Sequence, residues 1–167
     1  LAKRKPGMSF VLPAGAHVEA IVRDELLAWD VPCRIVTGDA AKWQAFGEAD
    51  VAIAASGTVL LELALAGVPH MSSYKLDPVS RMLVNMFTAW TAALPNMIAD
   101  RVVVSENYDW HLRPERLAIE AAQLASDTLH RDAMLADFDL IRSRMEVGRP
   151  ASAVAAETVL AVIAGRL

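Results

Sequence analysis

The chain has 167 residues, of which 54% are hydrophobic and 22% are charged, and its formal net charge at pH 7 is −4. This balance is typical of one packed globular domain and excludes an extended disordered chain. The small negative charge gives no general attraction to nucleic acid, so a nucleic-acid partner is not expected. Cys33 is the only cysteine, which excludes an internal disulfide and a cysteine zinc cage.

Strand-like and helical segments alternate along the first half of the chain. Short apolar runs predict strands over residues 8–12, 33–36, 51–55 and 70–74. The first and third of these strands are expected to be buried, because they contain almost no polar residues. Helical spacing predicts helices over residues 16–29, 40–47 and about 58–66. This alternation predicts an α/β fold with a doubly wound parallel sheet.

The second half of the chain is predicted to be mostly helical. Pro78 fits the first turn of a helix that reaches about Trp90. No strand is predicted after Arg101, and helices are expected over residues 114–124, 131–145 and 151–163. We therefore expect a single domain over residues 1–167 with a helical tail from about residue 113. Because Leu1 stands in what looks like the end of a helix, we also expect the chain to be a piece of a longer protein.

The turn Ser56-Gly57-Thr58 is the best candidate for a ligand site, because it joins a buried strand to a helix. In open parallel sheets, ligands bind beyond the carboxyl ends of the strands. A glycine there lets the backbone approach a ligand closely, and the free amides of the helix N-terminus favour a phosphate. The alternative is an ordinary helix capped by Ser56 without any ligand.

Glu62 lies on the helix after this turn, among apolar residues that predict burial. A buried carboxylate is costly unless it has hydrogen-bonding partners. Glu62 lies four residues after Thr58 and so on the same helix face, where it could hold a polyol such as a ribose just behind a bound phosphate. The alternative is a buried ion pair, for instance with Arg101 or Lys75.

The predicted helix before Trp90 is rich in thioethers and aromatic rings, which suit a changeable apolar contact. A lipid-bearing substrate or a membrane surface would use such residues, and core packing is the alternative. The candidate lipid contacts are Met82, Met86, Phe87 and Trp90. The four histidines are far apart and lack metal-ligand spacing, so no metal site is predicted.

Several motifs in order resemble the donor-binding core of the lipid-A-disaccharide synthases. The resemblance runs from about residue 8 to the C-terminus and is specific because the motifs keep the family's spacing. They are Ser56-Gly57-Thr58, Glu62, Ala64 with Pro69, Tyr74-Lys75, Leu94-Pro95-Asn96, Arg101, Val103, Glu106 and Pro114-Glu115-Arg116-Leu117.

The resemblance implies the Rossmann-like C-terminal half of a GT-B glycosyltransferase, which needs no metal and no cofactor. The activity that it implies is inverting transfer of a diacylglucosamine from its UDP derivative to a lipid monosaccharide phosphate, with release of UDP. Ser56, Gly57 and Thr58 would then approach the diphosphate, and Glu62 the ribose. Asn96 and Arg101 would belong to the same donor pocket, although Arg101 could instead pair with Glu106.

The resemblance also implies partners and a cellular location. The acceptor site and the catalytic base belong to an N-terminal domain that this chain lacks, so the chain alone is expected to be inactive. The family's Leu-Pro-Gly-Ser-Arg motif is also absent, and Asp109 stands where the family has Gln. The implied location is cytoplasmic and peripheral on the inner membrane. The alternatives are another GT-B enzyme, such as a UDP-N-acetylglucosamine transferase or a UDP-sugar epimerase, and a non-catalytic nucleotide-binding domain.

Overall fold

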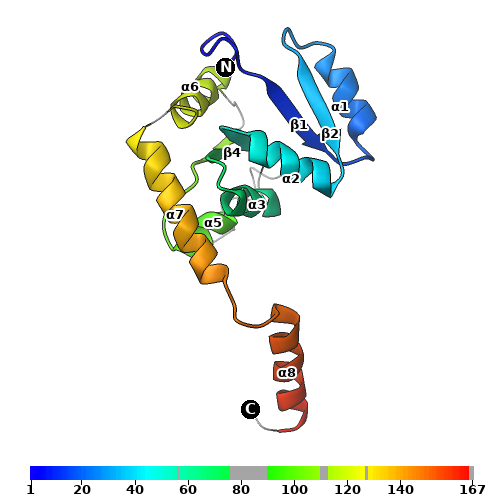
Figure 1. Cartoon of the computed structure of the whole chain (residues 1–167), viewed down its shortest axis with the longest axis vertical. Helices are drawn as coiled ribbons and strands as arrows, with labels where there is room; N and C mark the ends of the chain where they lie inside the picture. The colour runs from blue at the N-terminus through cyan, green and yellow to red at the C-terminus, as the bar shows by residue number, and fades with distance from the viewer. Residues whose placement is uncertain (56, 76–89, 110–112, 127, 166–167) are drawn as a thin grey trace.

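The computed structural model describes residues 1–55, 57–75, 90–109, 113–126 and 128–165. Helices and strands alternate along the first half of the chain, as predicted (Figure 1). The elements there are β1 (Phe10–Ala14), α1 (Glu19–Leu26), β2 (Cys33–Thr37), α2 (Asp39–Glu48), β3 (Ala52–Ala54), α3 (Thr58–Ala66) and β4 (His70–Lys75). The second half contains α5 (Leu94–Ala99), β5 (Glu106–Asp109), α6 (Pro114–Leu124), α7 (Leu129–Met145) and α8 (Ala151–Ile163). Most of the helix predicted over residues 78–90 lies outside the described residues.

Every strand pairing among the described residues is parallel, which confirms the predicted Rossmann-like α/β class. The strands form two sheets, one with the order β1-β2 and one with the order β3-β4-β5. The register of the first sheet runs from Phe10 opposite Cys33 to Ala14 opposite Thr37. Paired parallel strands need a crossover between them. The helix α1 connects β1 to β2, and α3 connects β3 to β4, whereas α2 connects the two sheets.

Two elements of the second half were not predicted. The short helix α5 forms on the Leu94-Pro95-Asn96 segment, with Pro95 in its first turn, where proline is tolerated. The strand β5 pairs with β4, so that Glu106 lies opposite Ser72. The prediction of no strand after Arg101 is therefore wrong, because a parallel neighbour supplies the hydrogen bonds that this polar segment needs.

The expected burial of the first and third strands is also wrong. No residue of β1 is buried, and Ile53 in the middle of β3 is 48% exposed. Each of these strands pairs along only one edge with the described residues, and β1 and β3 do not pair with each other. An apolar strand that pairs with only one neighbouring strand, and whose faces are only partly covered by helices, keeps much of its surface accessible to solvent.

The hydrophobic core lies between the second sheet and the helices of the second half. Its largest fully buried side chains include Phe138 and Ile141 of α7, Leu124 of α6 and Met71 of β4. A smaller buried cluster of Phe46, Leu63 and Val68 joins α2 to α3. Together these two clusters fix the position of α3, whose first turn carries the candidate site.

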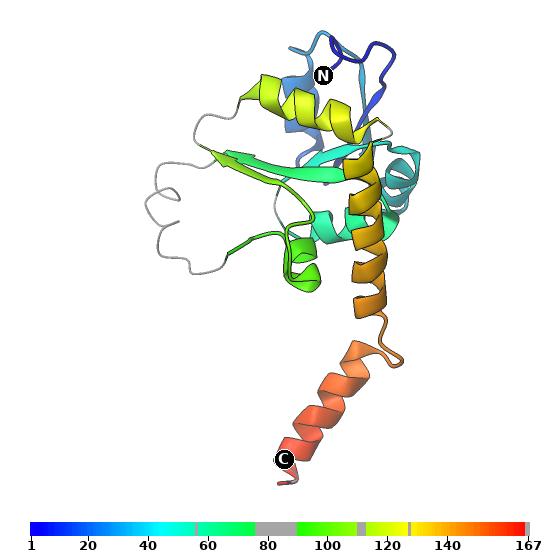
Figure 2. The ribbon, with the colours of Figure 1, turned by 90° about the vertical axis from the view of Figure 1, so that its left-hand side faces the viewer.

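The helix α8 extends away from the rest of the molecule (Figures 1 and 2). None of its residues is buried, although its sequence is largely apolar. No helix among the described residues combines the length and the apolar composition that crossing a bilayer requires.

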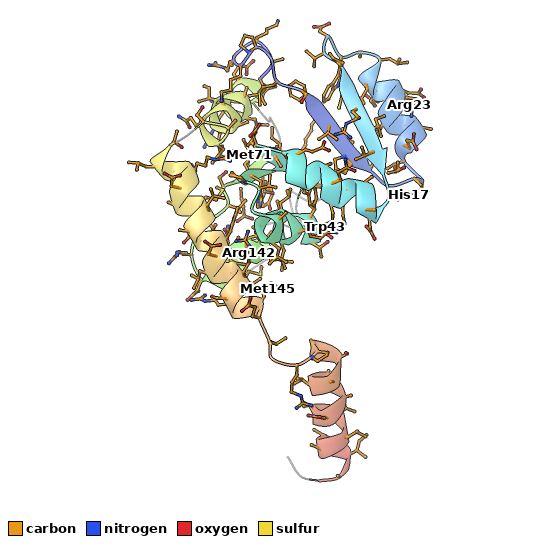
Figure 3. The ribbon with its side chains drawn as sticks, in the orientation of Figure 1. His17, Arg23, Trp43, Met71, Arg142 and Met145 are labelled. Carbon is orange, nitrogen blue, oxygen red and sulfur yellow. The ribbon has the colours of Figure 1, made fainter. Side chains whose placement is uncertain are left out.

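Arg142 of α7 caps the C-terminal end of α3, which is followed by Gly67 (Figure 3). Its guanidinium donates hydrogen bonds to the Leu65 carbonyl at 3.1 Å and to the Ala64 carbonyl at 3.5 Å. Gly67 has a φ of 76°, and a Cβ there would lie 2.9 Å from Nη2 of Arg142. The glycine thus allows both the left-handed turn and the close approach of the arginine.

Replacing Arg142 with Met is expected to lower the free energy of unfolding by about 1–2 kcal/mol, because Met cannot donate to these carbonyls. Urea unfolding followed by circular dichroism measures the change. Arg149→Met is the matched control, because Arg149 is exposed and pairs with Glu157 within the α8 region. Loss of that exposed pair should cost less than about 1 kcal/mol. Equal effects of the two substitutions would contradict the capping role of Arg142.

Candidate functional site

The turn between β3 and α3 places a glycine with open space beside it at the amino end of α3, and binding of an anion there stays a prediction. Gly57 is the residue that precedes the first turn of α3, and its φ of 108° lies in the region that favours glycine. A Cβ at Gly57 would meet no atom within 4 Å, so the space beside the turn is open. Thr58 begins the helix and is exposed. Ser56 lies outside the described residues, and the helix cap is Gly57 rather than the serine.

Glu62 lies one turn further along α3 and is half-buried, with 30% of its side chain exposed. The neighbouring positions Leu60 and Leu63 are fully buried, so Glu62 and Thr58 occupy the accessible side of the helix. The expectation of a deeply buried carboxylate is therefore wrong, because α3 turns this side toward α2 and the solvent rather than toward the core.

The Glu62 carboxylate is paired with Lys42 of α2 and not with Lys75 or Arg101. Nζ of Lys42 donates to Oε1 of Glu62 at 2.9 Å, and it lies 3.3 Å from Oδ1 of Asp39. Only 24% of the Lys42 side chain is exposed. The hydrogen bond to Glu62, partly opposed by burial, raises the pKa of the Lys42 ammonium, which favours its charged form.

Lys42 follows a second glycine turn that resembles the one at Gly57. Gly38 lies between β2 and α2, has a φ of 86°, and also leaves open space where a Cβ would lie. Both turns come at the carboxyl ends of parallel strands, which is where ligands bind in open parallel sheets. Sequence reasoning did not single out Lys42. The available signal was the Thr37-Gly38-Asp39 turn after a predicted strand.

Arg101 is paired with a helix of the second half, and its contact with a donor stays a prediction. Its guanidinium pairs with Asp137 of α7, and this contact raises the pKa of the arginine. The alternative pairing of Arg101 with Glu106 is therefore wrong. It fails because Arg101 follows the C-terminal end of α5, which packs against α7.

Glu106 instead accepts hydrogen bonds from the segment before α5. Oε1 of Glu106 accepts from the backbone amide of Ala92 at 2.9 Å, and Oε2 accepts from the Thr91 hydroxyl. The amide nitrogen of Asn96 lies 3.4 Å from Oε2. This cluster connects the segment before α5 to the start of β5.

Asn96 is fully buried, and its polar atoms are used within the protein. Oδ1 accepts from the backbone amides of Val103 and Val104, both at 2.8 Å. Nδ2 donates to the Val104 carbonyl at 2.9 Å and to the Thr91 hydroxyl at 3.1 Å. In this structure Asn96 thus holds the loop before β5 against α5, and its contact with a donor stays a prediction.

The candidate lipid contacts Met82, Met86 and Phe87 lie outside the described residues. Trp90, the fourth of them, is 57% exposed. Among the residues that the structure describes, no group of three or more His, Cys, Asp or Glu side chains could hold a metal ion.

Two surface hollows lie elsewhere on the molecule. One is lined by the end of α1 and the start of β2, including Trp29 and Cys33, and the other lies beside α6, near Asn107 and Glu120. Neither hollow includes Gly57 or Glu62. The candidate site at the amino end of α3 is therefore separate from both of these hollows.

The parallel strands, the alternating helices and the glycine turns at their carboxyl ends define a Rossmann-like α/β protein. The family model described as lipid-A-disaccharide synthetase matches residues 2–161. The chain therefore belongs to the lipid-A-disaccharide synthetase family.

Curated relatives named lipid-A-disaccharide synthase agree with this assignment. The relative from Rhodospirillum centenum is 36% identical over 169 residues, which cover 100% of this chain and 42% of the relative. The relative from Bradyrhizobium diazoefficiens is 33% identical over 155 residues, which cover 92% of this chain and 40% of the relative. The chain thus spans about two fifths of the length of these relatives.

Proposed function

We propose that this chain is the donor-binding part of a lipid-A-disaccharide synthase, a glycosyltransferase that uses a UDP-linked sugar. One observation carries the proposal: on α3, an accessible carboxylate, Glu62, lies one turn behind the open glycine turn at Gly57. The backbone amides of residues 57 and 58 and the positive end of the α3 dipole would hold the diphosphate. Glu62 would accept hydrogen bonds from the ribose hydroxyls. Family membership supports this choice of ligand.

The proposed reaction transfers a diacylglucosamine to a lipid monosaccharide phosphate with inversion at the anomeric carbon. The bond from the anomeric carbon to the diphosphate oxygen breaks, and a bond to the acceptor hydroxyl forms. The amino end of α3 would stabilise the negative charge that develops on the leaving UDP. The acceptor hydroxyl gives its proton to a base that we assign to residues outside this chain, so the chain alone should not catalyse transfer.

The arrangement of the two sheets supports a contribution from outside this chain. In the doubly wound order 3-2-1-4-5-6, the first strand lies between the second and the fourth. Among the described residues, the separate orders β2-β1 and β3-β4-β5 would fit that order if one further strand lay between β1 and β3. A strand of the longer protein would then pair with the open edges of β1 and β3. We further propose that the complete enzyme works at the cytoplasmic surface of the inner membrane, where its acylated substrates reside.

Titration calorimetry with UDP tests the donor site directly. Glu62→Ala is expected to weaken UDP binding by about 1–3 kcal/mol, because the ribose loses a charged hydrogen-bond acceptor. Glu48→Ala is the matched control, since Glu48 is an exposed carboxylate of α2 that pairs with Arg34. That control should bind UDP like the wild type. Full affinity of the Glu62→Ala variant would remove Glu62 from the site, and a wild-type chain that does not bind UDP would refute the proposed function.

A further inference from the structure

We infer that Lys42 is a positioning residue of the donor site, which holds the Glu62 carboxylate in the orientation that the ribose hydroxyls require. This inference rests on the function proposed above and adds a residue from a second helix to the site. The sequence motifs that predicted the donor site all come after α2, so the predicted site contained no residue of α2.

The packing of α2 against α3 fixes the distance between the two side chains. Phe46 of α2 and Leu63 of α3 belong to one buried cluster, so the helix backbones are held together on the core side. On the accessible side, Lys42 and Glu62 meet at 2.9 Å. The pair therefore spans two helices whose amino ends both lie at the carboxyl ends of strands.

The contact uses only one of the two carboxylate oxygens. Lys42 donates to Oε1 of Glu62, and no described residue donates a hydrogen bond to Oε2. Oε2 of Glu62 can therefore accept a hydrogen bond from a ligand hydroxyl. Because Lys42 limits the rotamers of the glutamate, less side-chain entropy is lost when the ligand binds.

The charge of Lys42 also matters for a ligand that carries phosphates. A lone carboxylate one turn behind Gly57 would repel a diphosphate bound at the amino end of α3. The ammonium group of Lys42, 2.9 Å from Glu62, offsets part of that repulsion. Asp39, 3.3 Å from the same ammonium group, also carries a negative charge, but its side chain is 91% exposed and its charge is screened by solvent. Lys42 thus lowers the repulsion between Glu62 and an anionic ligand.

The alternative is that Lys42 leaves Glu62 and contacts the diphosphate itself. The two roles differ in whether Lys42 affects recognition of the ribose or recognition of the diphosphate. A positioning role makes recognition of the ribose hydroxyl depend on Lys42, whereas a phosphate contact leaves that recognition intact.

The test compares UDP with 2′-deoxyuridine diphosphate, by calorimetry, on the wild-type chain and on three variants. The wild type should bind UDP about tenfold more tightly than the deoxy ligand, because one charged hydrogen bond is lost. Lys42→Met should reduce this ratio to about twofold or less, and Lys42→Arg should restore most of it. Asp39→Asn is the matched control, because it changes the other partner of Lys42 and keeps Glu62 paired, so its ratio should equal that of the wild type.

The outcomes separate this inference from the function on which it rests. A tenfold ratio that persists in Lys42→Met overturns the positioning role. If both ligands then bind more weakly by the same factor, Lys42 contacts the phosphates directly. A wild-type ratio near one overturns the positioning role as well. No binding of UDP by the wild type refutes the donor site itself. Far-UV circular dichroism and the thermal midpoint verify folding, and Lys42→Gln replaces Lys42→Met if that variant does not fold.

Discussion

Acidification from pH 6.5 to pH 4 is expected to remove about 3 kcal/mol of stability through one residue, His70. His70 of β4 is fully buried, its ring stacks on Phe138 of α7 with centroids 5.4 Å apart, and burial lowers its pKa from 6.5 to about 4. The folded protein therefore resists protonation of this ring, whereas the unfolded chain takes up a proton below pH 6.5. The difference of about 2.5 pKa units corresponds to about 3 kcal/mol.

The sign of the effect follows from which state binds more protons. Above pH 6.5 the histidine is neutral in both states, so its contribution to stability is complete. Between pH 6.5 and pH 4 only the unfolded chain is protonated there, and the free energy of unfolding falls as the pH falls. Below about pH 4 the contribution is lost.

Urea unfolding at several pH values between 7.5 and 4 measures this dependence, and His70→Asn provides the comparison. Nδ1 of His70 lies 2.7 Å from the carbonyl oxygen of Val68, and an asparagine amide can make a similar bond without titrating. Carboxylates contribute to acid unfolding in both proteins, so the quantity to compare is the difference between the two pH curves. If His70→Asn lost stability with the same pH slope as the wild type, the buried neutral histidine would not be the cause.

Asn96→Ala is expected to lower the free energy of unfolding by about 3–5 kcal/mol. The substitution leaves the backbone amides of Val103 and Val104 without an acceptor, and both residues are buried. Each buried donor without a partner costs about 1–3 kcal/mol, and a small cavity adds to the loss. Urea unfolding at neutral pH gives the value.

The matched control is Asn107→Ala. Asn107 is half-buried, and its amide donates to Glu120 at 3.3 Å, so its loss should cost less than about 1 kcal/mol. UDP titration of both variants at low temperature, where the weakened protein stays folded, separates stability from binding. An Asn96→Ala variant with wild-type stability and lost UDP affinity would assign Asn96 to ligand contact instead of to the loop before β5.

The sequence predicted the elements with a clear period and missed those whose partners are distant in the sequence. The helix over 114–124 and the helix over 151–163 were predicted with the bounds that the structure has, because their periods and their proline starts are local signals. The strand β5, with the sequence Glu-Asn-Tyr-Asp, has no apolar alternation, and only its neighbour β4 makes it a strand. The burial of β1 and β3 was overestimated because composition does not tell how many edges of a strand are paired.

In the candidate site, too, features local in the sequence were predicted and contacts between distant residues were missed. The spacing from Gly57 to Glu62 lies within one helix, so the shared face was accessible to sequence reasoning. The partner of Glu62 was not, because Lys42 reaches it only through the packing of α2 against α3. The ion-pair partner of Arg101 was missed for the same reason, since Asp137 lies 36 residues away on α7.

The position of α2 has a consequence for motion in the N-terminal quarter of the chain. The elements β1, α1 and β2 contribute no residue to the buried core, whereas α2 contacts β1, β2 and α3 (Figure 1). Amide protons of β1 and β2 should therefore exchange by local opening at a lower free energy than those of β4. Because α2 also carries Lys42, a ligand that binds Glu62 would slow the amide exchange of β1 and β2. Ligand binding would thus make two strands more ordered that the ligand itself does not contact.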